Sequence, residues 1–171
     1  MKEILYKVAI EGISGSTDIG VSHISSDSRN MARGDMYVAI KGTQLDGHQF
    51  IDQAIASGAQ SIICENLPEN LKTGIVYIQV NDAREALGWA AANFYDNPSH
   101  ELKLIGITGT NGKTSVATLL FDLFNIEKPN AGLISTVAVR YGEKQFTATH
   151  TTPDPLTINK HLRAMVDQDL E

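Results

Sequence analysis

The feature that most constrains this chain is a glycine-rich turn set between an apolar run and an amphipathic segment. Residues 102–108 have the composition of a β-strand, and residues 113–124 have the periodicity of an amphipathic helix. The turn between them holds three glycines, Gly106, Gly109 and Gly112. Such a turn directs backbone N–H groups inward, and the helix N-terminus adds positive charge, so together they cradle a polyphosphate. We therefore predict a strand–loop–helix site for a nucleotide.

Side chains at the end of this turn supply specific chemistry. Lys113 is placed to reach β- and γ-phosphates, and the Thr114 hydroxyl is placed to bind Mg²⁺, as in phosphate-loop enzymes. The spacing departs from the usual phosphate-loop pattern, because Ile107 stands where that pattern has glycine. We predict Lys113 as the catalytic residue and Thr114 as the metal ligand. The predicted nucleotide-binding residues are Gly109, Thr110, Asn111, Gly112, Lys113, Thr114 and Ser115.

Short strands and helices alternate before residue 98, a pattern that favours an α/β fold. We expect strands at residues 35–40, 61–64 and 75–80, and helices at residues 50–56 and 83–95. Asp82 and Glu85 have the spacing of a capping box, in which each side chain satisfies a free backbone N–H. Turn-forming residues 96–99 follow, and we place a domain boundary there. The predicted domains are residues 1–98 and residues 99–171.

The segment after residue 98 resembles the beginning of a second α/β unit. Residues 132–139 are expected to form its next strand, which pairs through a turn at residues 141–144 with residues 145–149. A further helix is expected from Pro153-Asp154-Pro155 to about Asp167. One or two parallel strands leave exposed edges and faces, so we expect the chain to be a fragment of a longer protein. Apolar surface should remain poorly covered around Ile105, Ile107, Ile134 and Val137.

The charge balance and the single cysteine exclude several classes of protein. With 14 Lys and Arg against 20 Asp and Glu, the net charge is −6, which argues against nucleic-acid binding. No apolar run approaches the ~20 residues of a membrane span, and the N-terminus lacks a signal-peptide pattern, so we expect a cytoplasmic protein without membrane insertion. Cys64 alone forms neither an intrachain disulfide nor a cysteine zinc site, and its apolar neighbours predict a buried thiol.

Residues 109–115, Gly-Thr-Asn-Gly-Lys-Thr-Ser, resemble the ATP loop of the Mur ligases and of their relatives, the folylpolyglutamate synthetases. Four upstream segments narrow this resemblance to the MurE type, which adds the third peptide residue to UDP-N-acetylmuramoyl-L-alanyl-D-glutamate. These segments are residues 26–29, 34–42, 46–51 and 54–59. Downstream, Thr151-Thr152-Pro153-Asp154 is similar to a Thr-Thr-Pro segment of the same family. The resemblance covers essentially the whole chain.

This resemblance implies a fold and a reaction. The fold is a small N-terminal α/β UDP-substrate domain, followed by the truncated start of a phosphate-loop, parallel-sheet ATPase domain. With ATP and Mg²⁺ as cofactors, the D-glutamate carboxylate is phosphorylated, and the amine of diaminopimelate or lysine attacks the acyl phosphate. In the family, a metal-binding Glu, a carbamylated Lys and the amine-presenting domain lie further along than residue 171. We therefore expect residues 1–171 alone to be inactive in ligation.

The resemblance also implies substrate-binding positions. Ser26 and Ser28 would contact the UDP-sugar, helped by the loop of Thr43, Gln44 and Leu45. Thr151 and Thr152 would hold the muramoyl-peptide part, beside His150, which stands where relatives often have Asn and whose role stays open. The expected partners are UDP-N-acetylmuramoyl-dipeptide and an amino acid; the sequence indicates no obligate protein partner.

The residues by themselves leave other roles open. Ser26-Asp27-Ser28 also suits a turn, and Arg29 suits either a phosphate contact or a pair with Asp27 or Asp35. Asp46-Gly47-His48 also suits a turn, although its histidine is suited to stack or to donate a hydrogen bond. Two alternative functions stay open as well. One is another ATP-dependent amide ligase of the Mur superfamily, and the other is a nucleotide or UDP-sugar binding module without ligase activity.

Overall fold

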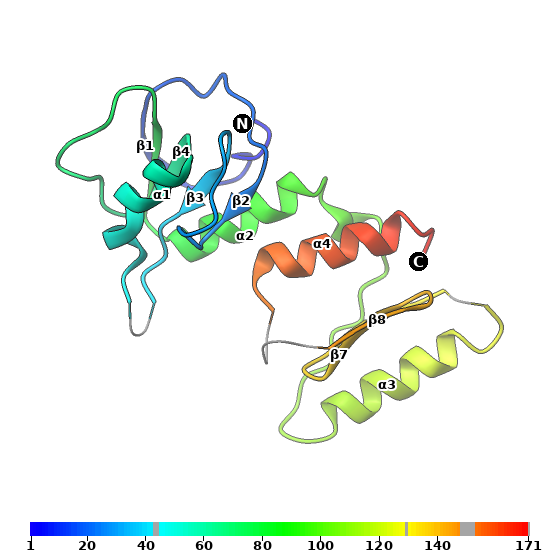
Figure 1. The fold of residues 1–171 in the computed structure, drawn as a ribbon. Coiled ribbons are helices and arrows are strands. Elements are labelled where there is room, and N and C mark those ends of the chain that lie inside the picture. Colours follow the sequence, from blue (N-terminus) through cyan, green and yellow to red (C-terminus); the bar gives the residue numbers. More distant parts are fainter. Residues whose placement is uncertain (43–44, 129, 148–152, 171) are drawn as a thin grey trace. The chain divides into compact units, whose positions relative to one another are not determined.

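The computed structural model describes the chain except for residues 43–44, 129, 148–152 and 171. The chain divides into two compact units, Met1–Phe94 and Tyr95–Glu171, which are described separately (Figure 1). The division falls at Phe94, whereas the sequence pointed to the turn that contains Pro98. The assignment of the two units to substrate and nucleotide binding stays a prediction.

A five-stranded sheet forms the centre of the first unit, in the spatial order β1-β5-β4-β3-β2. The strands are β1 (Ile10–Ser14), β2 (Ile24–Ser25), β3 (Met36–Val38), β4 (Ser61–Cys64) and β5 (Val76–Val80). Neighbouring strands from β2 to β5 pair in parallel, while β1 runs antiparallel to β5 at the edge. The α/β fold class is therefore confirmed. The sequence missed β1 and β2: β1 lies at the edge of the sheet and none of its residues is fully buried, and β2 has only two residues.

Helices cover this sheet because its central strands are apolar on both faces. All four residues of β4 are buried, as expected for an inner strand of a parallel sheet. Tyr37, Ile62 and Tyr77 pack on one face in a cluster that includes Ile51 and Ala54 of helix α1 (Ile51–Ser57). A short 3₁₀ turn, η1 (Gly47–Phe50), precedes α1. Helix α2 (Ala83–Phe94) buries an alanine-rich face and contacts β4.

Local signals located these helices correctly. Asp82 Oδ1 accepts hydrogen bonds from the backbone N–H groups of Arg84 and Glu85, so the predicted aspartate cap of α2 is present. Helix α1 ends at Gly58, whose φ of 124° is a conformation that favours glycine. Cys64 is fully buried in β4, as predicted, and this burial raises the pKa of its thiol to about 11.

The second unit combines a hairpin-like sheet with two longer helices. Its elements are η2 (Pro98–His100), α3 (Lys113–Phe124), β6 (Gly132–Ile134), β7 (Ala138–Tyr141), β8 (Lys144–Thr147) and α4 (Pro155–Val166). The three strands pair antiparallel in the order β6-β7-β8. Helix α4 supplies Leu162 and Met165 to a small core with Val139 and Tyr141 of β7, joined by Leu170. The bounds of α3 agree with the predicted helix.

Two strand predictions for the second unit are wrong. Residues 102–108 form no strand, because a strand needs a hydrogen-bonded neighbour and none of the described strands pairs with this segment. Residues 132–139 do not form one continuous strand: Ser135 Oγ accepts from the N–H groups of Val137 and Ala138 and turns the chain between β6 and β7. The sheet of this unit, expected to be parallel, is antiparallel in its described strands. The predicted hairpin turn at residues 141–144 is confirmed.

Apolar side chains of the second unit remain accessible to solvent, as the sequence predicted for two of four positions. Ile105 is 61% exposed and Val137 is 62% exposed. Ile107 and Ile134 are half-buried. Among the described residues, no helix has the length and apolarity needed to cross a bilayer.

Candidate functional site

The predicted phosphate loop lies directly before α3, as its sequence indicated. Gly112 is the N-cap residue of this helix and has a φ of 76°, and Gly109 has a φ of 150°. A Cβ added at Gly112 would meet no atom within 4 Å, so the loop there is open and not packed against protein. The glycine at 112 therefore serves the backbone conformation of the turn, which brings the chain into the first turn of the helix.

The N-terminus of α3 differs from the N-termini of α2 and α4. Asp82 and Asp154 cap α2 and α4 with side-chain oxygens, whereas Gly112 provides no side-chain hydrogen bond to α3. The first N–H groups of any helix lack partners inside the helix and carry its positive partial charge. An anion bound here would accept from these groups, which is the arrangement a phosphate requires.

Lys113 is exposed and folds back over the loop. Its ammonium Nζ donates to the carbonyl oxygens of Gly109 and Thr110, the latter at 3.2 Å. These contacts hold a cation at the mouth of the turn. The neighbouring Thr114 is half-buried, and both side chains line the same cavity. The structure thus brings together the predicted loop residues from Gly109 to Ser115, on one loop and the first turn of one helix.

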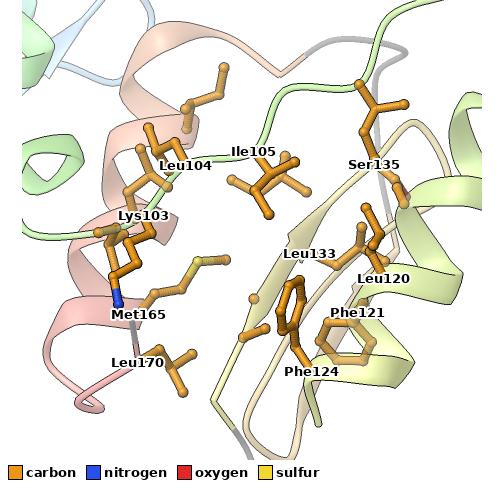
Figure 2. A pocket seen from close by; sticks show the side chains of 18 of the residues that line it. Lys103, Leu104, Ile105, Leu120, Phe121, Phe124, Leu133, Ser135, Met165 and Leu170 are labelled. Atoms are coloured by element: carbon orange, nitrogen blue, oxygen red, sulfur yellow. The ribbon is translucent and has the colours of Figure 1, made fainter.

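This cavity has a volume of about 560 Å³ and lies wholly within the second unit. Its wall is mainly apolar: Leu120, Phe121 and Phe124 of α3 face Met165 and Leu170 across the space (Figure 2). Residues 102–107 contribute a further side, including Ile105. Lys113 and Thr114 thus form a polar part of an otherwise apolar cavity wall.

The described residues fit the phosphates of a nucleotide better than they fit a complete magnesium site. A free helix N-terminus, an exposed ammonium and open glycines match the needs of a polyphosphate. For Mg²⁺, the Thr114 hydroxyl is the one predicted ligand, and the described residues contain no cluster of three or more His, Cys, Asp or Glu side chains able to hold a metal. Bound Mg²⁺ would therefore rely on phosphate oxygens and water as its remaining ligands.

A second group of predicted residues lies at the carboxyl ends of the parallel strands in the first unit. Ser26 follows β2 directly and is exposed. Ser28 is only 6% exposed, and its hydroxyl donates to Gln53 Oε1 at 3.2 Å. The two serines thus differ, since Ser26 faces solvent while Ser28 is held against α1. In open α/β sheets, ligands bind at this edge.

Arg29 pairs with Asp27, one of the two roles that the sequence left open. Its Nε and Nη2 donate to the two carboxylate oxygens of Asp27 at 2.8 and 2.7 Å. The side-chain hydrogen bonds from Arg29, followed by the bond from its backbone N–H, lower the pKa of Asp27 to about 2. Arg29 is largely exposed and Asp27 is partly exposed, so this pair shapes the turn more than it stabilises the fold.

The loop after β3 carries the remaining predicted residue that the structure describes. Leu45 is 64% exposed. Gly42 N–H donates to the Leu45 carbonyl at 2.8 Å, and Lys41 forms a bridge with Asp46, so the two ends of the loop are joined. Thr43, Gln44, His150, Thr151 and Thr152 lie outside the described residues, and their predicted roles stay predictions.

Sequence reasoning missed the network that surrounds this loop. His48 bonds Asp46 through one ring nitrogen and the backbone of Glu65 and Asn66 through the other. Arg84 at the start of α2 donates to the Lys41 carbonyl at 2.8 Å. The motif Asp46-Gly47-His48 is visible in the sequence, but the hydrogen-bond partners of His48 outside this motif are distant in sequence, so no local pattern could predict them.

Comparison with known proteins agrees with this architecture. A model described as "Mur ligase family, catalytic domain" matches residues 20–95, and one described as "Mur ligase middle domain" matches residues 107–171. The chain therefore belongs to the Mur ligase family. The chain spans about a third of the length of the curated relatives it matches.

Two of these relatives carry the same name, UDP-N-acetylmuramoyl-L-alanyl-D-glutamate–2,6-diaminopimelate ligase. The protein from Cytophaga hutchinsonii is 48% identical over 97% of this chain and 34% of its own length. The protein from Bacteroides fragilis is 45% identical over 98% of this chain and 35% of its own length. This chain is therefore similar, from end to end, to ligases of the MurE type.

Solved structures show the same fold. A crystal structure of MurF from Acinetobacter baumannii matches 95% of this chain and 32% of its own, with a TM-score of 0.62 and 24% identity. MurF ligase from Thermotoga maritima, crystallised in complex with ADP, matches 84% of this chain and 30% of its own, with a TM-score of 0.52 and 26% identity. Both matches support the α/β arrangement described above.

Proposed function

We propose that this chain carries the UDP-substrate and nucleotide-loop parts of a ligase that adds the third amino acid to UDP-N-acetylmuramoyl-L-alanyl-D-glutamate. The observation that carries the proposal is the phosphate loop before α3, where Lys113 and an uncapped helix N-terminus occur in a chain of the Mur ligase family. The names of the relatives favour diaminopimelate over lysine as the added amino acid. Their higher identity, compared with the MurF structures, favours this reaction over D-alanyl-D-alanine addition.

The chemistry requires a leaving group, because a carboxylate is a poor electrophile at neutral pH. ATP with Mg²⁺ would supply it by phosphorylating the side-chain carboxylate of D-glutamate. In this chain, the loop N–H groups and Lys113 would neutralise the charge on the transferring phosphoryl group, and the Thr114 hydroxyl would ligate the metal. Fixed donors of this kind need no reorganisation during the reaction, so their removal reduces the rate.

The first unit would bind the nucleotide end of the acceptor. Ser26 and Leu45 lie exposed at the carboxyl edge of the parallel sheet, where ligands of α/β folds bind. Ser28 would contact the substrate through its backbone or act through its hydrogen bond to Gln53, because its hydroxyl already donates to that side chain. Thr43 and Gln44 in the first unit, and His150, Thr151 and Thr152 in the second, complete the proposed substrate contacts. In this proposal the substrates are cytoplasmic metabolites, and the protein acts in the cytoplasm.

Replacing Lys113 tests the proposal directly. In the full-length product of the gene, Lys113→Ala should lower diaminopimelate-dependent phosphate release and ligated product by about 10²–10³-fold, the usual cost of removing one fixed donor to a developing charge. Lys160→Ala removes an exposed lysine from α4 and is the matched control, with unchanged activity. Product is identified by mass spectrometry. An unreduced rate in Lys113→Ala would contradict the role of the loop, and a wild-type protein that ligates no amino acid to the muramoyl dipeptide would contradict the function.

A further inference from the structure

We infer that His48 is a positioning residue that holds the two described ends of the loop after β3, Lys41–Gly42 and Leu45–Asp46, in place for substrate binding. This inference rests on the proposed function, in which that loop contacts the UDP-sugar. His48 lies in η1, directly after the loop, and its side chain is only 13% exposed. Because it is mostly buried, this side chain is placed to contact the protein and not a ligand.

The loop is closed at its base by backbone contacts. Gly47 N–H donates to the Ile40 carbonyl at 2.9 Å, and the buried Tyr37 donates its hydroxyl to the Gly47 carbonyl at 2.9 Å. A Cβ at Gly47 would lie 2.7 Å from both the N and O atoms of Ile40, so the two chain segments approach as closely as glycine allows. These bonds determine where the loop begins and ends, and the contacts of His48 add the link to the rest of the sheet edge.

Both ring nitrogens of His48 are engaged inside the protein. Nε2 accepts from the N–H groups of Glu65 and Asn66 at 2.9 and 3.3 Å, so this nitrogen carries no proton. The proton of the neutral ring is therefore on Nδ1, which donates to Asp46 Oδ1 at 2.6 Å. The backbone N–H of His48, and then this ring bond, lower the pKa of Asp46. One imidazole thus ties the end of the loop to the segment that follows β4.

The network continues to α2 and returns to the loop. Glu65 Oε1 accepts from Ala83 N–H at 3.1 Å at the start of α2. The next residue, Arg84, donates from Nη2 to the carbonyl of Lys41 at 2.8 Å, at the other end of the loop. Loop, His48, Glu65 and the first turn of α2 therefore form a closed ring of hydrogen bonds at the carboxyl edge of the sheet. Because the described ends of the loop are held in this way, they lose less conformational entropy when the ligand binds.

Two substitutions at His48 separate its bond to Asp46 from its bonds to the backbone of Glu65 and Asn66. In His48→Gln, the amide oxygen lies near the position of Nε2 and can still accept from Glu65 and Asn66. In His48→Asn, the shorter side chain reaches only the position of Nδ1, so the bonds to residues 65 and 66 are lost. Binding of UDP-N-acetylmuramoyl-L-Ala-D-Glu to the 171-residue chain is measured by calorimetry. We expect Kd to rise at least tenfold in His48→Asn and less than threefold in His48→Gln.

A measurement on the wild-type chain makes the test independent of variant folding. The ring ¹⁵N shifts of His48 should show Nδ1 protonated and Nε2 unprotonated, and the Glu65 and Asn66 amide signals should shift when the muramoyl dipeptide is added. A protonated Nε2, or equal affinity of wild type and His48→Asn, would contradict the positioning role of His48 while leaving the proposed function intact. A wild-type chain that binds no muramoyl dipeptide would instead contradict the proposed substrate role of this unit, and the tautomer would still decide whether His48 links the two segments.

Discussion

The first unit buries every residue of its strand β4 between neighbouring strands, whereas the second unit leaves the apolar segment 102–108 without a strand partner. Both units nevertheless form their helices where the sequence indicated, at residues close to 83–94, 113–124 and 155–166. The difference lies in the type of contact. Helix hydrogen bonds join residues four apart, while a strand depends on a second segment that is distant in sequence.

This comparison explains why one unit has a complete core and the other an open cavity. Ile62 in β4 is fully buried, and Ile105, in a segment of similar composition, is 61% exposed. Apolarity makes both segments suitable for an inner strand, but only β4 has partners on both sides, β3 and β5. The apolar wall around Phe121 and Phe124 is the result in the second unit.

The largest expected effect comes from deleting side-chain volume in the complete core. Ile62→Ala should reduce the free energy of unfolding of the first unit by about 2–5 kcal/mol, because it leaves a cavity between the sheet and α1. The matched substitution in the second unit, Ile105→Ala, should change stability by no more than about 0.5 kcal/mol, since an exposed side chain makes few contacts. Urea unfolding followed through Trp89 in α2, together with hydrogen exchange of each unit, measures both. Equal losses would show that residues 102–108 are packed after all.

Removing a helix cap is expected to have an intermediate effect on stability, of equal size in the two units. Asp82→Ala and Asp154→Ala each remove a side-chain acceptor from the first turn, so each should destabilise its helix by about 1 kcal/mol. Asparagine caps helices as well as aspartate does, so Asp82→Asn and Asp154→Asn should retain most of the stability. Hydrogen exchange of α2 and α4 gives the two values. A loss of helix stability confined to one unit would contradict the expectation that aspartate caps stabilise the helices of both units equally.

The smallest effect on stability is expected at the exposed pair of Arg29 and Asp27. Arg29→Gln removes the side-chain hydrogen bonds that are the largest cause of the lowered pKa of Asp27 and leaves the backbone bond, so this pKa should rise from about 2 part of the way toward its ordinary value of 3.8. Because the folded pKa is the lower one, the stabilisation by the pair is fully present above the unfolded pKa and is lost as pH falls through about 2. Titration of the Asp27 carboxyl carbon by NMR reports the change. Arg33→Gln, another exposed arginine, should leave the titration unchanged.

Much of the proposed nucleotide loop could be predicted, because its residues are consecutive. The glycines, Lys113 and Thr114 occur in one short segment, and their backbone conformation follows from glycine at 112 and from the helix that begins at 113. The proposed substrate edge of the first unit was harder to predict. Ser28 was expected to face a ligand, yet its hydroxyl bonds Gln53, which lies 25 residues further along the chain. No local pattern indicates which of two neighbouring serines a helix will cover.

The sequence by itself determined the helices, the aspartate cap of α2, the turn at Gly112 and the buried position of Cys64, because each depends on nearby residues or on an apolar run. Only the tertiary structure decided which apolar runs become strands, as the contrast between β4 and residues 102–108 shows. It also decided the partners of His48, whose bonds to Glu65 and Asn66 span 17 and 18 residues. A side chain's hydrogen-bonding capacity is a property of its own atoms, but the partner that satisfies it depends on how distant segments meet.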